Sequence, residues 1–370
     1  MAVRRQMIAD VPIGILLSGG IDSSIVTAIA AEVSSSKVKT FTISFPGHSA
    51  FDESPYARIV AQHFGTEHLE LAAEEASLAL LPQLVRQFDE PIADSSAIPT
   101  YVVSRLIRGY ATVALGGDGG DELFGGYSQY VWVNRIARIQ AWLPSPLRRL
   151  VARAAEAIPI GTRGRNYAIA LGKEGYATLQ RTSLAFDSEW RRELLVAQDG
   201  LHPTPDELRL ELTTGAHSLL QGMQRIDFRS YMVDDILVKV DRASMLASLE
   251  TRAPFLDPAV IEFAFSRVPD HLKADLREQK ILLRRLAARL LPAELHSRPK
   301  QGFLVPLNAW FRGGLGSTMR EVLSDAHPKL FRAAGIARLF DRQAKHGNQL
   351  NRLYALTVFE LWRREYRVDV

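Results

Sequence analysis

Residues 16–24 read Leu-Leu-Ser-Gly-Gly-Ile-Asp-Ser-Ser and stand where a predicted strand turns into a predicted helix. The apolar run 13–17 has the length of a short strand, and residues 22–31 show the spaced apolar side chains and alanines of a helix. Glycines let the backbone approach a ligand closely, and the unpaired amides at a helix start favour an anion. The stretch therefore predicts a phosphate-binding loop.

Asp22 is an unusual residue for such a loop, because a bare carboxylate would repel phosphate oxygens. A divalent cation between the carboxylate and the phosphates removes this repulsion, and Mg²⁺ is the natural candidate. The alternative is an ordinary glycine-serine turn in which Asp22 caps the helix. The chain contains neither the Walker A pattern nor the G-x-G-x-x-G dinucleotide fingerprint.

The composition is that of a large globular protein. With 370 residues, 47% of them hydrophobic, the chain has the length for two compact units or for one large α/β domain with an extension. The absence of cysteine excludes disulfides, thiolate metal sites and a cysteine nucleophile. The 45 basic and 41 acidic residues are mixed along the chain, which argues against a nucleic-acid binder. Without a long apolar run or a signal peptide, the expected location is the cytoplasm, with no membrane partner.

Strand and helix signals alternate up to about residue 130, which predicts a parallel sheet covered by helices. Beyond that point strand signals fade, so residues 131–370 are expected to be mainly helical, with breaks at 159–165 and 199–206. Ser54 is predicted to cap a helix that has Pro55 in its first turn. The further predicted strands cover 38–45, 67–71 and 111–115, and the further predicted helices cover 55–64, a segment around 81–88, and 98–108.

A second glycine-rich stretch, residues 116–127, follows the strand predicted at 111–115 and contains Asp118, Asp121 and Glu122. Six glycines between 116 and 126 make a costly backbone to order, which favours a functional role. The spacing of an EF-hand calcium loop does not fit this stretch. Ligands of open α/β sheets bind beyond the carboxyl ends of the strands, so this loop is predicted to face the first loop across one crevice.

Four strings of residues carry a resemblance to a known family. The first loop resembles the SGGxDS pyrophosphate loop of the ATP pyrophosphatases, the PP-loop enzymes. The later strings resemble those of glutamine-dependent asparagine synthetases. They are LGGDGGDELFGGY at 115–127, DDILVKVDRASMLASLETRAPFLD at 234–257 and RPKQGFLVPLNAWF at 298–311. The match thus covers almost the whole chain, which is identified as a member of the asparagine synthetase family.

The resemblance implies a fold and a reaction. The fold is an adenine nucleotide alpha hydrolase-like α/β sandwich: one synthetase domain over 1–370, with a PP-loop core at 1–130 and a helical part at 131–370 that completes the active site. The reaction converts L-aspartate and ATP into β-aspartyl-AMP and pyrophosphate, after which ammonia displaces AMP to give L-asparagine.

The resemblance also implies site residues. The pyrophosphate loop corresponds to Ser18, Gly19, Gly20, Asp22, Ser23 and Ser24, the magnesium ligands to Asp22 and Asp121, and the AMP site to Leu17, Ile43, Gly116 and Gly117. Lys300 matches the lysine that stabilises charge at the α-phosphate. Asp118 stands where the family has a glutamate that acts as base on ammonium. Glu122, Arg242 and Arg252 are candidates for binding the amino acid substrate, with structural ion pairs as the alternative.

The family's usual enzyme begins with a glutaminase domain, which this sequence does not contain. We therefore expect either a fragment or a stand-alone synthetase module that uses free ammonia. It stays open whether the chain pairs with a glutaminase domain or subunit, and whether it forms a homodimer. Two other functions are also open. One is a related amide-forming synthetase with a different acid or amine, and the other is a non-catalytic nucleotide-binding partner of an amidotransferase.

Overall fold

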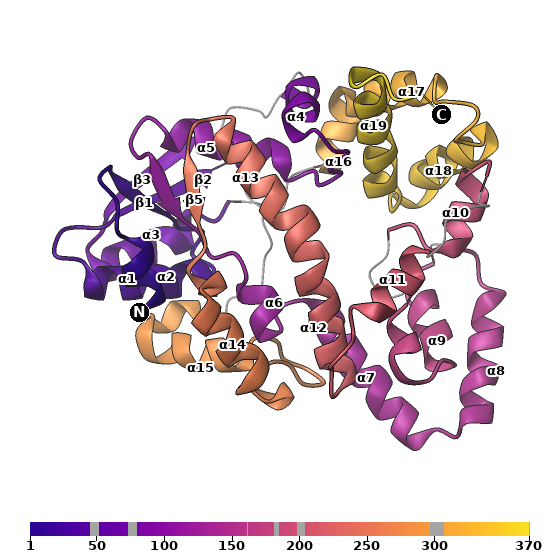
Figure 1. The fold of residues 1–370 in the computed structure, drawn as a ribbon, viewed down its shortest axis with the longest axis horizontal. Coiled ribbons are helices and arrows are strands. Elements are labelled where there is room, and N and C mark those ends of the chain that lie inside the picture. Colours follow the sequence, from indigo (N-terminus) through magenta and orange to yellow (C-terminus); the bar gives the residue numbers. More distant parts are fainter. Residues whose placement is uncertain are drawn as a thin grey trace.

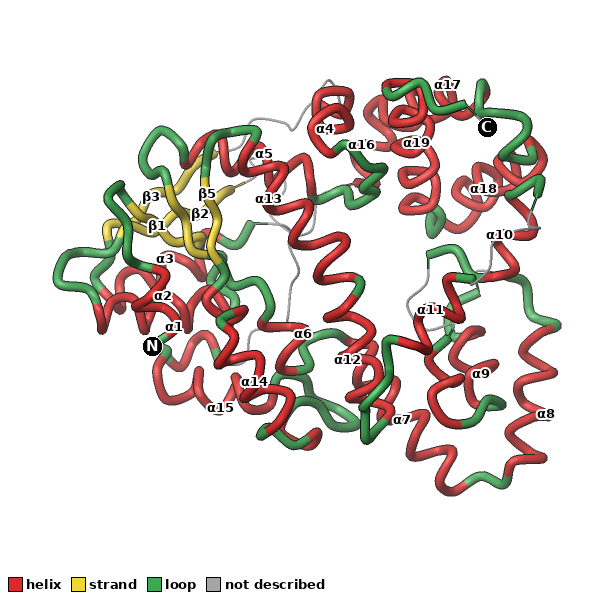
Figure 2. Tube along the Cα trace, in the orientation of Figure 1, coloured by secondary structure: helices red, strands yellow, loops and turns green. Residues whose placement is uncertain are grey.

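The fold is built on a five-stranded parallel sheet with helices on both faces (Figures 1 and 2). The computed structural model describes residues 1–44, 52–72, 80–160, 162–180, 185–197, 204–296 and 307–369. Within this part of the chain the strands are β1 (Ile13–Leu16), β2 (Lys39–Ser44), β3 (Glu67–Ala72), β4 (Val113–Leu115) and β5 (Glu250–Arg252), in the order β3-β2-β1-β4-β5.

The strand order places the ligand-binding edge of the sheet between β1 and β4. From β1 the chain continues outward through β2 and β3 on one side, whereas β4 and β5 lie on the other side. Parallel α/β sheets bind ligands where the strand order reverses in this way, beyond the carboxyl ends of the strands. The two glycine-rich loops follow β1 and β4, so both begin at this point of the sheet.

Apolar side chains attach the helices to the two faces of the sheet. On one face, Ile15 and Leu17 pack in a buried cluster with residues of α2 (Ile21–Val33), α3 (Ser54–Phe64) and α15 (Ile281–Leu290). On the other face, Phe41 and Ala114 pack with residues of α5 (Ala97–Ile107). Gly14 gives the Phe41 ring room in the sheet, since a Cβ at residue 14 would lie 2.1 Å from the ring.

The strands and helices predicted for the first 115 residues are confirmed, with ends that differ by at most two residues. One detail was wrong: the N-cap of α3 is Glu53 rather than Ser54, which is the first helical residue. Asp52 instead accepts hydrogen bonds from the backbone N–H of Ser54, at 3.0 Å, and from its hydroxyl. A carboxylate two residues before the first helical residue therefore takes over the role predicted for the serine.

Strand β5 was not predicted, because it is only three residues long and lies far along the chain. It pairs with β4 over Val113–Leu115, and the carbonyl of Arg252 accepts a hydrogen bond from the backbone N–H of Gly116 at 2.8 Å. The last residue of β5 thus fixes the first residue of the second glycine-rich loop.

The rest of the described chain is helical, as predicted. Two apolar clusters organise it, one around Trp190, Leu339 and Tyr354 and the other around Tyr130 and Met223. The predicted break at 159–165 separates α8 from α9, and that at 199–206 falls mostly outside the described residues. None of the described helices is long and apolar enough to span a bilayer. The remaining α-helices are α1 (Ala2–Gln6), α4 (Leu81–Phe88), α6 (Gly120–Phe124), α7 (Ser128–Trp142), α8 (Ser145–Glu156), α9 (Arg165–Leu171), α10 (Ser188–Leu194), α11 (Pro205–Glu211), α12 (Leu219–Arg229), α13 (Val238–Met245), α14 (Pro258–Ser266), α16 (Leu307–Trp310), α17 (Gly316–Ser324), α18 (Ala333–His346) and α19 (Leu350–Glu365).

Short 3₁₀ and π-helical segments join these helices. The 3₁₀ segments are Gly175–Leu179, Pro254–Leu256, Asp270–Leu272 and Ala293–Leu295. The π-helical segments are Tyr231–Leu237, between α12 and α13, and Phe311–Leu315. Together with α12 and α13, the first of these crosses the middle of the molecule, from the helical half to the sheet (Figure 1).

Candidate active site

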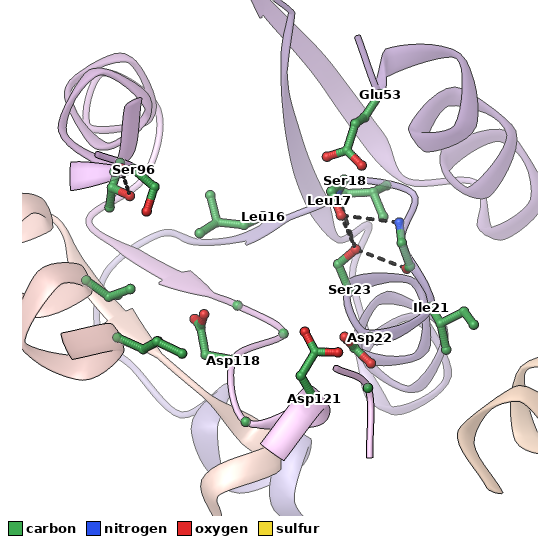
Figure 3. Close-up of a pocket in the computed structure, with 18 of the residues that line it drawn as sticks. Leu16, Leu17, Ser18, Ile21, Asp22, Ser23, Glu53, Ser96, Asp118 and Asp121 are labelled. Atoms are coloured by element: carbon green, nitrogen blue, oxygen red, sulfur yellow. Dashed lines mark hydrogen bonds between the residues drawn. The ribbon is translucent and has the colours of Figure 1, made fainter. Parts of the chain in front are cut away.

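The first glycine-rich loop joins β1 to α2 and is held in a tight turn. Gly19 has a φ of +66°, and a Cβ there would lie 2.6 Å from the backbone N of Ala57 at the start of α3. Glycine is therefore required both by the backbone conformation and by the packing of α3. The hydroxyl oxygens of Ser18 and Ser23 lie 3.0 Å apart, and Ser23 Oγ accepts a hydrogen bond from the backbone N–H of Ser18 (Figure 3).

The second glycine-rich loop packs directly against the first, which confirms that the two loops face each other. A Cβ at Gly117 would lie 2.9 Å from Cβ of Asp22, and one at Gly120 would lie 2.7 Å from the carboxylate of Asp22. Side chains at these positions would push the loops apart. The absence of side chains at both positions thus lets α6 bring Asp121 next to Asp22.

Asp22 and Asp121 share one cation, the ammonium of Lys280. Lys280 Nζ pairs with Asp22 Oδ2 and lies 2.7 Å from Asp121 Oδ1, and the two carboxylates approach each other from α2 and α6 (Figure 3). Lys280 is 6% exposed and immediately precedes α15. Burial alone would lower the pKa of Lys280, but the charges of Asp22 and Asp121 raise it above its usual value. The lysine therefore stays protonated between the two acids.

The same two carboxylates suit a magnesium ion. They converge on one point that a positive charge already occupies, and carboxylate oxygens are ligands that Mg²⁺ accepts alongside phosphate oxygens and water. Gly126 preserves this arrangement, because a Cβ there would lie 1.8 Å from Asp121 Oδ1 and 2.3 Å from Lys280 Cε. Asp22 and Asp121, close together as predicted, fit the ion that the sequence implied.

Gly126→Ala is therefore expected to damage the site without unfolding the protein. The new methyl group would displace Asp121 and Lys280, and we expect a fall of kcat of at least about tenfold, because a misplacement of about 1 Å in an active site can cost about 100-fold in rate. Steady-state pyrophosphate release from ATP measures the change. Gly109→Ala is the control, since its nearest neighbour would lie at an ordinary 3.6 Å. Equal activity of the two variants would contradict the prediction.

The two loops open into a cavity of about 650 Å³. It is lined by residues of the sheet edge, of both loops, and of α5, α13 and the start of α15. Most of the residues predicted for the site line it: Leu17, Ser18, Gly19, Gly20, Asp22, Ser23, Ile43, Gly116, Gly117, Asp118, Asp121 and Glu122.

Three predicted residues do not line the cavity. Ser24 is fully buried in α2. Arg242 pairs with Asp89 at 3.3 Å. Arg252 pairs with Glu250 at 2.6 Å and donates hydrogen bonds to two backbone carbonyls near the N-terminus. Both arginines thus form the structural ion pairs that were the alternative reading. Lys300 lies outside the described residues.

Carboxyl groups with raised pKa values form another part of the cavity. Glu122 is 1% exposed and accepts a hydrogen bond from the hydroxyl of Tyr127. Its burial raises the pKa to about 7, although the Tyr127 hydrogen bond acts in the opposite direction. Burial also raises the pKa of Asp118, and the nearby Lys239 opposes this rise. In Figure 3 the Asp118 carboxylate lies apart from the pair formed by Asp22 and Asp121.

The raised pKa of Glu122 predicts a pH-dependent stability. Between pH 4.5 and about 7 the folded protein keeps a proton that the unfolded chain has lost, so the free energy of unfolding falls as the pH rises. Glu122→Gln removes this titration. The free energy of unfolding of the variant, relative to that of the wild type, is expected to be about 1–3 kcal/mol higher at about pH 8 than at about pH 4. Urea unfolding at both pH values measures the gain, and a stability difference that is independent of pH would contradict it.

A buried ion pair in the cavity was missed by the sequence analysis. Lys239 Nζ lies 2.8 Å from Asp94 Oδ2, and both residues line the cavity. Lys280 was missed as well. Isolated lysines are usually surface residues. The acidic partners of Lys239 and of Lys280 lie far from them in the sequence, so no local pattern pointed to either lysine.

The chain is similar to known proteins along almost its whole length. A sequence model of the asparagine synthase family matches residues 1–364. Asparagine synthetase [glutamine-hydrolyzing] 1 of Bacillus subtilis is 32% identical over 369 residues, which cover 98% of this chain and 57% of that protein. A Mycobacterium bovis protein, provisionally described as the same type of synthetase, is 34% identical over 98% of this chain and 56% of its own length. Amidase chyE of Penicillium rubens is 24% identical over 87% of this chain and 53% of its own length. The chain thus spans little more than half the length of these relatives.

Proposed function

The chain belongs to the asparagine synthase family, and from this premise we propose that it is an ATP-dependent ligase that forms L-asparagine from L-aspartate and ammonia. The side-chain carboxylate of aspartate attacks the α-phosphorus of ATP, which gives β-aspartyl-AMP and releases pyrophosphate. Ammonia then attacks the acyl carbon and AMP leaves. The observation that carries the proposal is the contact of two glycine-rich loops around Asp22, Asp121 and Lys280.

Asp22 and Asp121 are the residues that we assign to bind magnesium. When bound, the ion would neutralise negative charge on the pyrophosphate leaving group. The loop Ser18–Ser23 would hold the pyrophosphate oxygens with its backbone N–H groups and hydroxyls at the start of α2. Ser24 faces the protein core and is left out of this assignment.

Within the described part of the chain, Lys280 is the lysine that we propose to bind the phosphates of ATP. It reaches the same two carboxylates from the start of α15, and its ammonium stays charged in the buried site. A fixed cation beside the phosphates stabilises the charge that develops during phosphoryl transfer. The role first given to Lys300 stays a proposal about a residue outside the described part.

The adenosine part of ATP would lie along the sheet edge. Leu17, Ile43, Gly116 and Gly117 line the cavity there and are the residues that we assign to this end of the nucleotide. We also propose the division into a PP-loop core at 1–130 and a helical part at 131–370. Lys280 and Lys239, both from the helical part, line the same cavity as the loops, which supports the view that the second part completes the site.

Asp118 is the carboxylate that we assign to take the proton from ammonium. It lines the cavity apart from the magnesium acids, and its raised pKa brings it nearer to the working pH of the cell, as a proton acceptor requires. An Asp118→Asn variant should keep aspartate-dependent pyrophosphate release and lose asparagine formation. This separates the amide-forming step from the activation step.

The test of the function is product analysis with the purified chain. ATP, magnesium, L-aspartate and an ammonium salt are expected to give AMP, pyrophosphate and L-asparagine in equal amounts, as measured by mass spectrometry. Parallel reactions replace ammonium with glutamine. Aspartate-dependent pyrophosphate release without asparagine would refute ammonia as the acceptor.

The relative named an amidase motivates a second set of reactions with other acids and amines. AMP and pyrophosphate formed with one of these pairs but not with aspartate would favour a related amide-forming synthetase. ATP binding without pyrophosphate formation from any pair would favour the non-catalytic alternative.

A further inference from the structure

The ion pair between Lys239 and Asp94 lies in the wall of the cavity rather than in the packed core. The side chains are 11% and 18% exposed, and both residues line the cavity. Lys239 lies in the first turn of α13, directly after the π-helical segment Tyr231–Leu237, and such segments are frequent at functional sites. The backbone N–H of Ser96 donates to Asp94 Oδ1 at 2.8 Å, which fixes the orientation of the carboxylate. The pair is thus rigid and accessible from the cavity.

Carboxylates outnumber cations around this pair. The charges that raise the pKa of Lys239 come from Asp94, Asp235 and Asp118, in this order. Asp235 Oδ1 is buried and makes no hydrogen bond within the described part of the chain. A ligand that carries only a carboxylate would be repelled by these acids, and a ligand that carries only an ammonium would pair with Asp94 but would leave Lys239 without a contact. A ligand that carries both a carboxylate and an ammonium can pair with Lys239 and with Asp94.

The pair also lies at the correct end of the cavity for the acid substrate. Ser96, whose backbone N–H binds Asp94, lies on the opposite side of the view in Figure 3 from Asp22, with Asp118 between them. The phosphates would bind at the Asp22 end. An acid whose reacting carboxylate points toward the phosphates would therefore direct its other end toward Lys239 and Asp94.

We propose that Lys239 and Asp94 form the subsite for the amino-acid head group, with Lys239 binding the α-carboxylate and Asp94 binding the α-ammonium of the acid substrate. This inference rests on the proposed function and names the specificity-determining residues of the same cavity. The sequence analysis had given this role to Glu122, Arg242 and Arg252, and the two arginines do not line the cavity.

The test compares L-aspartate with two ligands that each lack one charge. Succinate lacks the α-ammonium, and β-alanine lacks the α-carboxylate. Calorimetry in the presence of magnesium and α,β-methylene-ATP, which is not cleaved, measures all three affinities. The wild type is expected to prefer L-aspartate to each analogue by about tenfold or more, since hydrogen bonds to charged groups contribute about 1.5–3 kcal/mol.

Each variant should lose one preference only. Lys239→Gln is expected to weaken L-aspartate binding about 10- to 100-fold and to abolish the preference over β-alanine, while the preference over succinate remains. Asp94→Asn should show the reverse pattern. Asp89→Asn is the matched control, because it breaks the exposed Asp89–Arg242 pair one helical turn away and should change neither preference.

Binding of α,β-methylene-ATP reports whether each variant is folded. The double variant, Lys239→Gln with Asp94→Asn, leaves neither partner of the pair charged and is measured alongside the single variants. Variants that keep both preferences would overturn the inference, and so would a wild type that binds the three ligands equally or not at all. The predicted binding pattern without pyrophosphate release would refute only the proposed function. Aspartate-dependent pyrophosphate release with unchanged preferences would refute only the subsite.

Discussion

Lys280→Met is expected to lower the rate of aspartate-dependent pyrophosphate release about 1,000-fold, which is the lower end of the effect of a single cationic side chain in phosphoryl transfer. The ammonium of Lys280 lies between Asp22 and Asp121, where the phosphates of ATP would bind. Methionine keeps the length of the side chain and removes its charge. The charge that develops on the phosphates would then lose its fixed partner, so kcat should fall more than the affinity for ATP.

Lys273→Met is the matched control for this variant. Lys273 is buried like Lys280, but it donates a hydrogen bond to the neutral Gln224 and does not line the cavity. Its loss tests how much activity depends on a buried lysine in general. Single-turnover pyrophosphate release, together with the affinity for α,β-methylene-ATP, separates catalysis from binding. A less than tenfold fall for Lys280→Met, about 1.4 kcal/mol of barrier, would refute the assigned role.

Replacing either of the two proposed magnesium ligands is expected to have an effect of similar size. Asp22→Asn and Asp121→Asn keep the shape of the side chain but remove the charge that would attract the metal. We expect kcat to fall about 100- to 1,000-fold, comparable to the loss of one stabilising group in a preorganised site. The magnesium concentration required for half-maximal activity should rise in both variants, because a neutral amide oxygen holds the ion less strongly than a carboxylate.

Metal binding can be measured apart from activity. Mn²⁺ in place of magnesium, with α,β-methylene-ATP, gives a paramagnetic resonance signal that reports the bound ion in wild type and variants. Glu32→Gln is the control, because Glu32 is exposed on the same helix as Asp22. Unchanged Mn²⁺ affinity in both aspartate variants would show that these residues do not hold the metal.

The sequence predicts the sheet and the two loops because their signals are local. Apolar runs of strand length alternate with helical patterns up to residue 115, and glycines mark the turns that follow β1 and β4. Strand β5 has no such signal, because Glu250, Thr251 and Arg252 form a short polar segment whose pairing depends on β4. Secondary structure of this kind is decided by tertiary contacts rather than by propensity.

The charged pairs of the site could not be predicted for a related reason. Lys280 is 258 residues from Asp22, and Lys239 is 145 residues from Asp94. No spacing rule links residues that far apart, and a single lysine carries no signal of burial. Arg242 was predicted because its motif resembles the family, but it pairs with Asp89 and does not line the cavity. Lys239, one turn earlier on the same helix, does line it.

The place of β5 beside β4 determines when the sheet can be completed during synthesis. A nascent chain that has emerged only as far as residue 130 would present β4 as an open edge, and such edges recruit strands from other molecules. The loop at Gly116 would also lack its anchor on Arg252. Recombinant fragments that stop before residue 252 are therefore poor candidates for crystallisation or ligand screening, and that residue must emerge from the ribosome before the cleft between the two glycine-rich loops can assemble.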